Sequence, residues 1–153
     1  MKTVTLLCIS ISLLCGVQAQ IQVPRAVSMA FQNKFPAIQS NEWEEEEKGV
    51  YEAEFKMKGR KMSAAFDETG KWLETETAIK KNALPDAVKK TIAAEFPGYE
   101  IDEAEKLETP EGLAYEVELE KEENKKEMEI EVLFSQEGAL LKKVAVVDKD
   151  DDD

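Results

Sequence analysis

The chain has 153 residues, of which 42% are hydrophobic and 35% charged, and its formal net charge at pH 7 is −13. That length suits one ordinary domain or two very small ones, and the apolar fraction is sufficient for a folded core. A surface so acidic repels nucleic-acid phosphates and anionic lipid headgroups, which argues against both as partners. A basic protein, a cationic peptide or metal cations would be attracted instead, although high charge also serves solubility alone.

The first segment of the chain resembles an export signal. Lys2 gives a short positive start, residues 4–14 are an apolar run too short to span a bilayer as a mature helix, and Val17-Gln18-Ala19 fits a cleavage site. We predict a signal peptide over residues 1–19 and a periplasmic or secreted protein without membrane insertion. A lipoprotein anchored through Cys15 is the less favoured alternative, because the residues before Cys15 depart from the lipoprotein pattern.

A mature chain starting at Gln20 would contain neither histidine nor cysteine, because the two cysteines are Cys8 and Cys15. It would therefore lack a disulfide, the usual zinc ligands, a thiol nucleophile and a Ser-His-Asp triad. Loss of Lys2 would leave 19 basic against 33 acidic residues, a net charge of −14. We predict that the protein is not an enzyme and uses no cofactor.

Two copies of one pattern fill the rest of the sequence. Residues 23–27 return as 84–88, and Phe35-Pro36 returns as Phe96-Pro97, both at an offset of 61 residues. The segment 51–55 returns at 115–119, and the offset grows only where loops tolerate insertion. We predict one repeat over residues 20–82, a second over 83–147, and a disordered acidic tail at 148–153.

Each repeat opens with a predicted helix. Pro24 and Pro85 suit the first helical turn, whereas Pro36 and Pro97 stop each helix after about three turns. Apolar residues four positions apart give each helix one apolar stripe. The stripes consist of Val27, Phe31 and Phe35 in the first copy and Val88, Ile92 and Phe96 in the second.

Strand-like alternation follows each predicted helix. In the first copy the strands are predicted near residues 41–45, 51–58, 62–66 and 72–79, with a turn at 67–70. In the second copy they are predicted near residues 101–107, 115–119, 128–134 and 140–147, with a turn at 136–138. We therefore expect an α+β fold of two tandem helix-plus-four-strand repeats, forming one antiparallel sheet with both helices on one face.

The first helix with its flanking prolines, the strand Tyr51–Phe55 and the turn segment Phe66–Lys71, together with their second copies, resemble the bacterial PepSY-like family, described as β-lactamase-inhibitor-like. The resemblance covers residues 21–147. It implies an exported protein of tandem helix-plus-four-strand repeats. It also implies protein binding, because in the structurally similar β-lactamase inhibitor the exposed sheet surface holds the enzyme. It supplies no catalytic residues.

Glutamates alternate with the apolar residues of the predicted strands, so they should face away from the helices. Like charges on adjacent strands cost stability, which suggests a use such as docking a basic partner. A solvated face, partly paired by Lys56, Lys58, Lys125 and Lys126, is the structural alternative. Trp72 shares strand parity with Glu74 and Glu76, which favours an interface role, or else it packs in the core. The predicted partner-binding set is Trp72, Glu52, Glu54, Glu74, Glu76, Glu116, Glu118, Glu129 and Glu131.

The acidic tail lacks the central glycine and the closing glutamate of an EF-hand loop, so no metal site is predicted there. We expect a non-enzymatic binding module, an inhibitor or adaptor, that engages a protein or basic peptide through its acidic sheet face. The alternative is an acidic envelope protein that binds or buffers cations without a defined protein partner.

Overall fold

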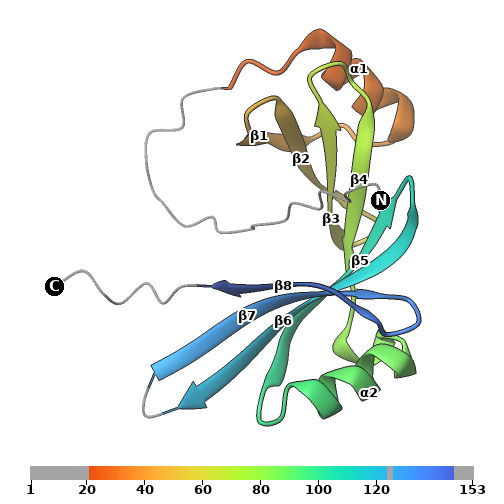
Figure 1. Ribbon diagram of the computed structural model, residues 1–153. Helices are drawn as coiled ribbons and strands as arrows, with labels where there is room; N and C mark the ends of the chain where they lie inside the picture. Colours follow the sequence, from red (N-terminus) through yellow and green to blue (C-terminus); the bar gives the residue numbers. More distant parts are fainter. Residues whose placement is uncertain (1–20, 124–125, 147–153) are drawn as a thin grey trace, which may run out of the picture.

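The computed structural model describes residues 21–123 and 126–146, so the predicted signal peptide and acidic tail lie outside the described residues. Eight strands form one antiparallel sheet in sequential order, with one helix near each end of the molecule (Figure 1). The elements are α1 (Arg25–Lys34), β1 (Asn41–Glu47), β2 (Val50–Met57), β3 (Arg60–Asp67), β4 (Trp72–Ala78), the short 3₁₀ helix η1 (Lys81–Ala83), α2 (Asp86–Glu95), β5 (Glu100–Thr109), β6 (Gly112–Glu123), β7 (Lys126–Ser135) and β8 (Leu140–Val146). The predicted α+β class and every predicted strand are confirmed.

Both helices begin directly after a proline and end before a Phe-Pro pair. Pro24 and Pro85 have ψ angles of 142° and 144°, so each precedes the helix as an extended cap, one position earlier than the helical turn predicted for it. Phe35 and Phe96 leave helical geometry, with ψ angles of 62° and 59°. The following proline disfavours the helical conformation at the residue before it, which accounts for both helix ends.

Each helix packs its apolar stripe against strands of its own half. In the first half, the ring of Phe31 lies 5.3 Å from that of Phe35, 5.4 Å from that of Trp43 and 5.3 Å from that of Phe55. In the second half the stripe of α2 packs against apolar residues of β5, β6 and β7, namely Ala104, Val117, Leu119, Ile130, Val132 and Phe134. The predicted stripes are therefore the core-facing residues of both helices.

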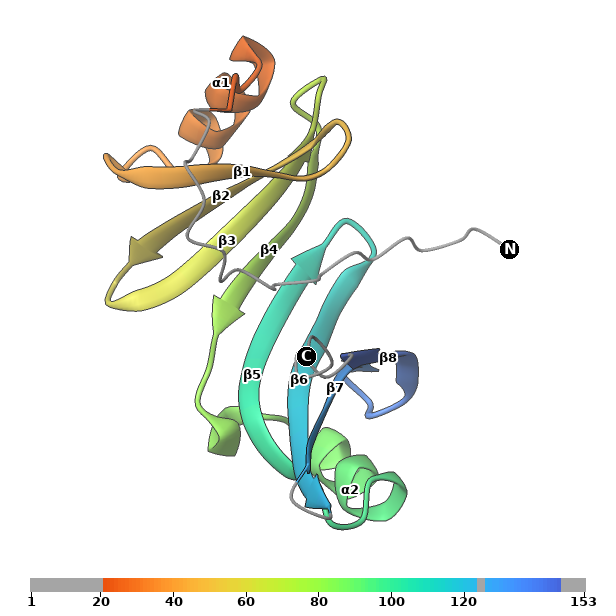
Figure 2. The ribbon, with the colours of Figure 1, turned by 90° about the vertical axis from the view of Figure 1, so that its left-hand side faces the viewer.

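The two halves meet where β4 pairs with β5. Thr75 lies opposite Glu108, Glu76 opposite Leu107 and Thr77 opposite Lys106, so the ladder continues from one half into the other. Figure 2 shows β4 and β5 side by side, although η1 and α2 separate them in sequence. A single antiparallel sheet therefore carries side chains of both halves next to each other at its centre.

The β3–β4 and β7–β8 turns contact the first turns of the two helices. Gly70 and Gly138 each have a φ of 83°, and a Cβ atom there would lie 2.6 Å from the carbonyl oxygen of Ala26 and 2.7 Å from that of Ala87. Such distances leave no room for a side chain, and the positive φ also favours glycine. The same close approach thus occurs at equivalent places in both halves.

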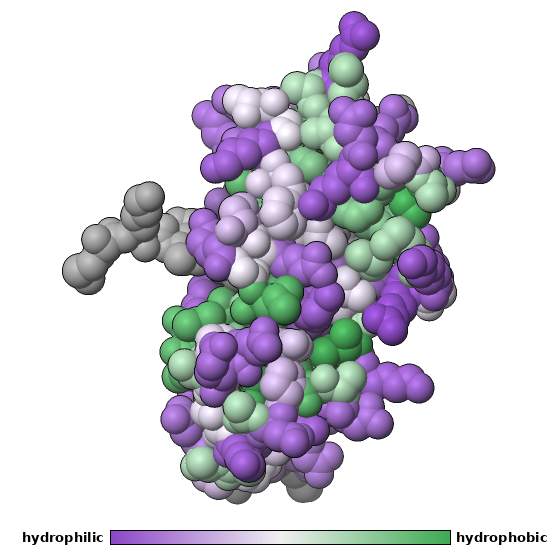
Figure 3. All heavy atoms as spheres, turned by 90° about the vertical axis from the view of Figure 1, so that its right-hand side faces the viewer, coloured by the Kyte–Doolittle hydropathy of each residue, from purple (hydrophilic) through white to green (hydrophobic). Residues whose placement is uncertain are grey.

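On the face of the molecule that Figure 3 shows, hydrophilic side chains cover much of the surface and apolar ones gather in separate patches. The exposed large apolar side chains are Met29, Leu113, Met128, Leu140 and Leu141. Neither helix in the described part of the chain is long and apolar enough to cross a membrane.

Candidate functional site

Glutamates project from the side of each strand that lies opposite its core residues. Along β2 the buried residues Ala53 and Phe55 join the first core, so Glu52 and Glu54 point the other way. In β6 and β7 the apolar residues Val117, Leu119, Ile130 and Val132 likewise join the second core. Leu107, Ala114 and Leu133 differ, because they form a third buried cluster on the glutamate side, where Leu107 lies opposite Glu76 and Leu133 opposite Glu116. We call the following residues the acidic face: Glu52, Glu54, Glu74, Glu76, Glu103, Glu105, Glu116, Glu118, Glu129 and Glu131.

Strand register places many of these carboxylates directly opposite one another. Glu105 pairs with Glu116 across β5 and β6, and Glu118 pairs with Glu131 across β6 and β7. Glu52 also pairs with Glu44 of β1. Like charges in such pairs destabilise a sheet, which sets this face apart from an ordinary solvated strand surface.

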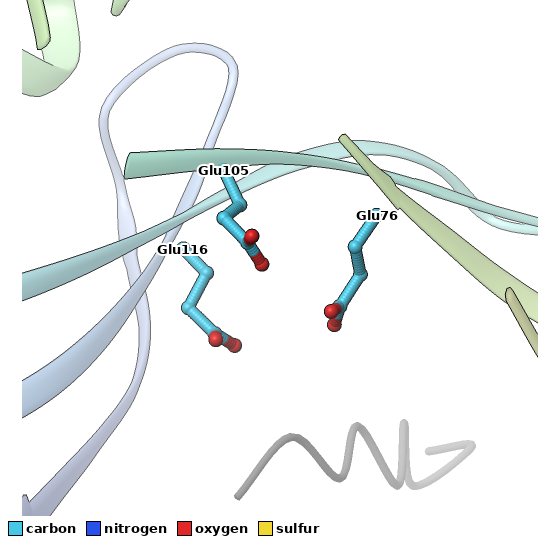
Figure 4. A group of neighbouring side chains, drawn as sticks. All are labelled: Glu76, Glu105 and Glu116. Atoms are coloured by element: carbon cyan, nitrogen blue, oxygen red, sulfur yellow. The ribbon is translucent and has the colours of Figure 1, made fainter. Parts of the chain in front are cut away.

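Three of these glutamates converge at the junction of the halves. Glu76, Glu105 and Glu116 come from β4, β5 and β6, and one carboxylate oxygen of each lies within 4.8 Å of the others. Their side chains point into one common space (Figure 4). The sequence prediction contained Glu76 and Glu116 but missed Glu105, because its strand shows only weak alternation and the pairing of β4 with β5 cannot be read from local pattern.

Several glutamates of the acidic face are more deeply buried than side chains on a solvated strand surface. Glu76 is 4% exposed, and Glu52 and Glu74 are each 7% exposed. The Oγ of Ser63 donates a hydrogen bond to Glu76 at 3.1 Å. The centre of the acidic face is therefore a partly dehydrated carboxylate cluster.

Dehydration changes the proton affinity of the cluster. Burial, together with repulsion from Glu76, Glu131 and Glu105, raises the pKa of Glu116 to about 10. Burial also raises the pKa of Glu105, where a hydrogen bond with Glu76 opposes the shift. Removing a carboxylate from water disfavours its charged form, and neighbouring negative charges add to that effect. At neutral pH this site consequently retains protons that exposed glutamates would have lost.

Two further glutamates keep protons for related reasons. Burial raises the pKa of Glu52 to about 7, with repulsion from Glu44 and Glu54 adding to the shift. Burial also raises the pKa of Glu118 to about 7, and this carboxyl group hydrogen-bonds Glu129. A protonated carboxyl group donates to an ionised neighbour, so the acidic face consists in part of carboxylic acid–carboxylate pairs.

A cavity of about 830 Å³ opens on this face, between the segment 37–42 and strands β2 to β5. Six glutamates and two lysines line it: Glu42, Glu52, Glu54, Glu76, Glu103, Glu105, Lys56 and Lys61. The Nδ2 of Asn41, also in the lining, is buried and makes no hydrogen bond among the described residues. The cavity could accept a cationic group at its carboxylates and a hydrogen-bond acceptor at Asn41.

The predicted placement of Trp72 beside Glu74 and Glu76 is wrong. A β-bulge lies where β3 pairs with β4, so Phe66 is opposite Trp72 and Ala65 is opposite Glu74, which leaves Leu73 as the extra residue. A bulge shifts strand parity by one, and Trp72 therefore packs against the core beneath α1. Its Nε1 donates to the Oγ1 of Thr75 at 3.0 Å, and the Nζ of Lys34 lies 3.7 Å from its ring centroid.

Of the lysines predicted to pair with this face, Lys56 and Lys58 form no ion pair with the described side chains. Lys56 lines the acidic cavity, whereas Lys58 occupies the β2–β3 turn and lines a different cavity. Lys125 lies outside the described residues, and the side chain of Lys126 is likewise not described. Ion pairs between described residues join Lys81 to Asp102, Lys89 to Asp86 and Lys106 to Glu108.

Solved structures share this fold. A DUF2874 family protein from Bacteroides uniformis is 21% identical with a TM-score of 0.72, covering 81% of this chain and 90% of its own. A protein from Bacteroides fragilis described as BLIP-like is 25% identical with a TM-score of 0.67, covering 88% of this chain and 94% of its own. A protein from Bacteroides eggerthii described as a "putative periplasmic" protein is 22% identical with a TM-score of 0.70, covering 81% and 89%.

No curated protein matches this chain. A family model, described as "Putative beta-lactamase-inhibitor-like, PepSY-like", matches residues 49–142, which is more than half of the chain. The match includes strands of both halves and every residue of the acidic face. The chain therefore belongs to the PepSY-like, β-lactamase-inhibitor-like family.

Proposed function

We propose that this protein is an exported, non-enzymatic binding module that holds a basic protein or peptide on its acidic face. The observation that carries the proposal is the dehydrated carboxylate cluster beside a cavity lined by six glutamates. Burying closely spaced carboxyl groups disfavours their charged form, and a cationic partner would stabilise that form on binding. The inhibitor-like family description, and a neighbour described as periplasmic, support the binding role and the location.

We further infer that the two halves are related repeats, with both helices on one face of the sheet and the acidic face on the other. Support comes from the equivalent helix ends and from the matching approaches of Gly70 to Ala26 and of Gly138 to Ala87. In this arrangement the helices bury the apolar side of each half. The opposite side carries the acidic face together with the small buried cluster of Leu107, Ala114 and Leu133.

Charge reversal at the cavity tests the proposed partner. Glu54 and Glu103 line the cavity and are exposed, so Glu54→Lys with Glu103→Lys should leave the fold intact. We expect the double variant to lose at least about tenfold in affinity for a basic envelope protein captured by the wild type, because rim charges steer and hold oppositely charged partners. Quantitative mass spectrometry of captured proteins, followed by calorimetry with the purified partner, measures the change.

A matched control reverses the same number of charges elsewhere. Glu68→Lys with Glu95→Lys changes exposed residues on the β3–β4 turn and α2, away from the cavity. This control should retain the partner. Equal binding by both double variants would refute the acidic face as the docking surface.

Cation binding is the alternative function, and the convergence of Glu76, Glu105 and Glu116 favours it. Calcium prefers carboxylate oxygens and would need this site ionised. If the alternative holds, added calcium raises the unfolding temperature of the wild type and leaves Glu105→Gln unaffected. An unchanged wild-type unfolding temperature would reject it.

A further inference from the structure

A second cavity, of about 540 Å³, lies on the helix side of the sheet. Met62, Thr77 and Lys106 stand side by side across β3, β4 and β5 and line part of it. The last residue of α1, Lys34, and the β2–β3 turn complete its wall. The cavity thus sits near the junction of the two halves, on the strand side that carries the core residues rather than the acidic face.

The charge of this cavity is opposite to that of the chain. Four cationic side chains line it, from Lys34, Lys58, Arg60 and Lys106, against the single carboxylate of Glu108. Lys106 already pairs with Glu108. The other three form no ion pair among residues 21–123 and 126–146, although the chain has 33 acidic and 20 basic residues. Three cations without a protein carboxylate therefore surround one concavity.

Apolar and hydroxyl groups form the rest of the lining. Phe35, Met57 and Met62 supply apolar surface, and Phe35 itself is 7% exposed. Thr77 is 6% exposed, and its hydroxyl makes no hydrogen bond within the described parts of the chain. Thr75 accepts the Trp72 bond and keeps its own hydroxyl proton to donate. A cavity of this size with apolar walls and a few convergent polar groups has the character of a small-molecule site.

Lys58, which lines the cavity, lies at a backbone position that disfavours lysine. Lys58 has a φ of 53° and Gly59 a φ of 77°, so the two-residue turn requires left-handed geometry at both positions. Asparagine or glycine is favoured at the first position of such turns, and lysine is disfavoured there. The chain places a cation at this unfavourable position, beside Arg60 and facing the cavity lining.

We propose that this cavity binds a small organic anion, with its carboxylate or phosphate held by Lys34, Lys58 and Arg60 and its apolar body against Phe35, Met57 and Met62. The Thr77 hydroxyl donates the remaining hydrogen bond. Arginine is suited to planar two-point contact with either anion, and lysine supplies further charge. The site is separate from the acidic face and does not depend on the partner proposed for it.

Titration followed by amide chemical shifts tests the site in the mature protein. Phenylphosphate and benzoate combine an anion with an apolar ring, benzyl alcohol keeps only the ring, and inorganic phosphate keeps only the charge. We expect saturable shifts around Met57–Arg60 and Thr77 with one or both ring-bearing anions, and weaker binding of the other two probes. The stronger ring-bearing anion identifies the preferred headgroup, phosphate or carboxylate.

Arg60→Gln should lower the affinity for the preferred anion about tenfold, because the variant loses a hydrogen bond from a charged group. Lys90→Gln removes the same charge from an exposed position on α2 and should change nothing. Shifts that spread over many lysines, or binding that Arg60→Gln and Lys90→Gln reduce equally, would show mere surface association and overturn the proposal.

Lys58→Asn gives a second, independent test. Asparagine suits the left-handed turn, so the variant should unfold at a higher urea concentration than the wild type. It should also bind the anion about threefold to tenfold more weakly, because one charge is lost. A purely structural lysine would leave affinity unchanged, and that result would count against the site.

Discussion

Raising the pH from about 5 to about 8 will lower the free energy of unfolding by about 2 to 4 kcal/mol. In the folded protein, the pKa of Glu116 is raised to about 10 and those of Glu52 and Glu118 to about 7. The ordinary pKa of a glutamate is 4.5, so the unfolded chain releases these protons at lower pH than the folded chain. Between those values the unfolded state binds fewer protons, and stability therefore falls as pH rises.

The pH window follows from the individual groups. The stability linked to Glu52 and Glu118 is lost as pH rises through about 7, whereas that linked to Glu116 continues to fall towards about 10. Asp67 acts in the opposite direction, because hydrogen bonds from Thr69 lower its pKa and its contribution is lost only in stronger acid. Urea unfolding at a series of pH values measures the slope.

Glu116→Gln tests whether Glu116 is the main source of this pH dependence of the free energy of unfolding. Glutamine keeps the size and one donor of the protonated side chain but cannot ionise, so it should stabilise the protein at about pH 8 by about 1 to 2 kcal/mol and flatten the slope. Glu95→Gln, at an exposed position on α2, is the matched control and should leave the slope unchanged. If Glu116→Gln retains the full wild-type pH dependence, the buried carboxylate cluster is not its source.

Local pattern was sufficient to predict the elements and, in strands without a bulge such as β6, which side chains face the core. The alternation of Glu116 and Glu118 with Val117 and Leu119 places the glutamates away from the core because a strand has a period of two. The helix ends followed from prolines with a direct steric effect on the preceding residue. These features depend on neighbours in sequence, which is why they were predictable.

Features that depend on strand pairing were not predictable. No glycine or proline marks the β-bulge where Ala65 and Phe66 pair with β4. The side of the sheet on which Trp72 lies could therefore not be predicted from the sequence. Glu76 is buried because β4 pairs with β5, although η1 and α2 separate these strands in sequence. The same pairing brings Glu76 close to Glu105. The cationic cavity likewise joins Lys34 to Lys106 across the chain, a proximity that only the folded sheet creates.

Replacing Gly138 by alanine will destabilise the protein by about 2 to 4 kcal/mol. Part of the cost, about 1 kcal/mol, comes from placing a side chain on a backbone with φ of 83°. The larger part is steric, because the new Cβ would lie 2.7 Å from the carbonyl carbon and oxygen of Ala87, which are backbone atoms of the first turn of α2. Relief would require the turn to move away from the helix. Gly70→Ala should behave alike, since its Cβ would lie 2.6 Å from the carbonyl oxygen of Ala26.

Gly59→Ala separates the two contributions. Gly59 also has a positive φ, 77°, but a Cβ atom there would meet nothing within 4 Å, so only the backbone cost of about 1 kcal/mol is expected. Urea unfolding of the three variants under the same conditions gives the difference directly. If Gly138→Ala costs no more than Gly59→Ala, the close approach of turn to helix is not a constraint on the fold. A large loss at Gly138 with a small one at Gly70 would instead show that the two halves do not share this packing device, because both glycines face the same atoms of their own helix.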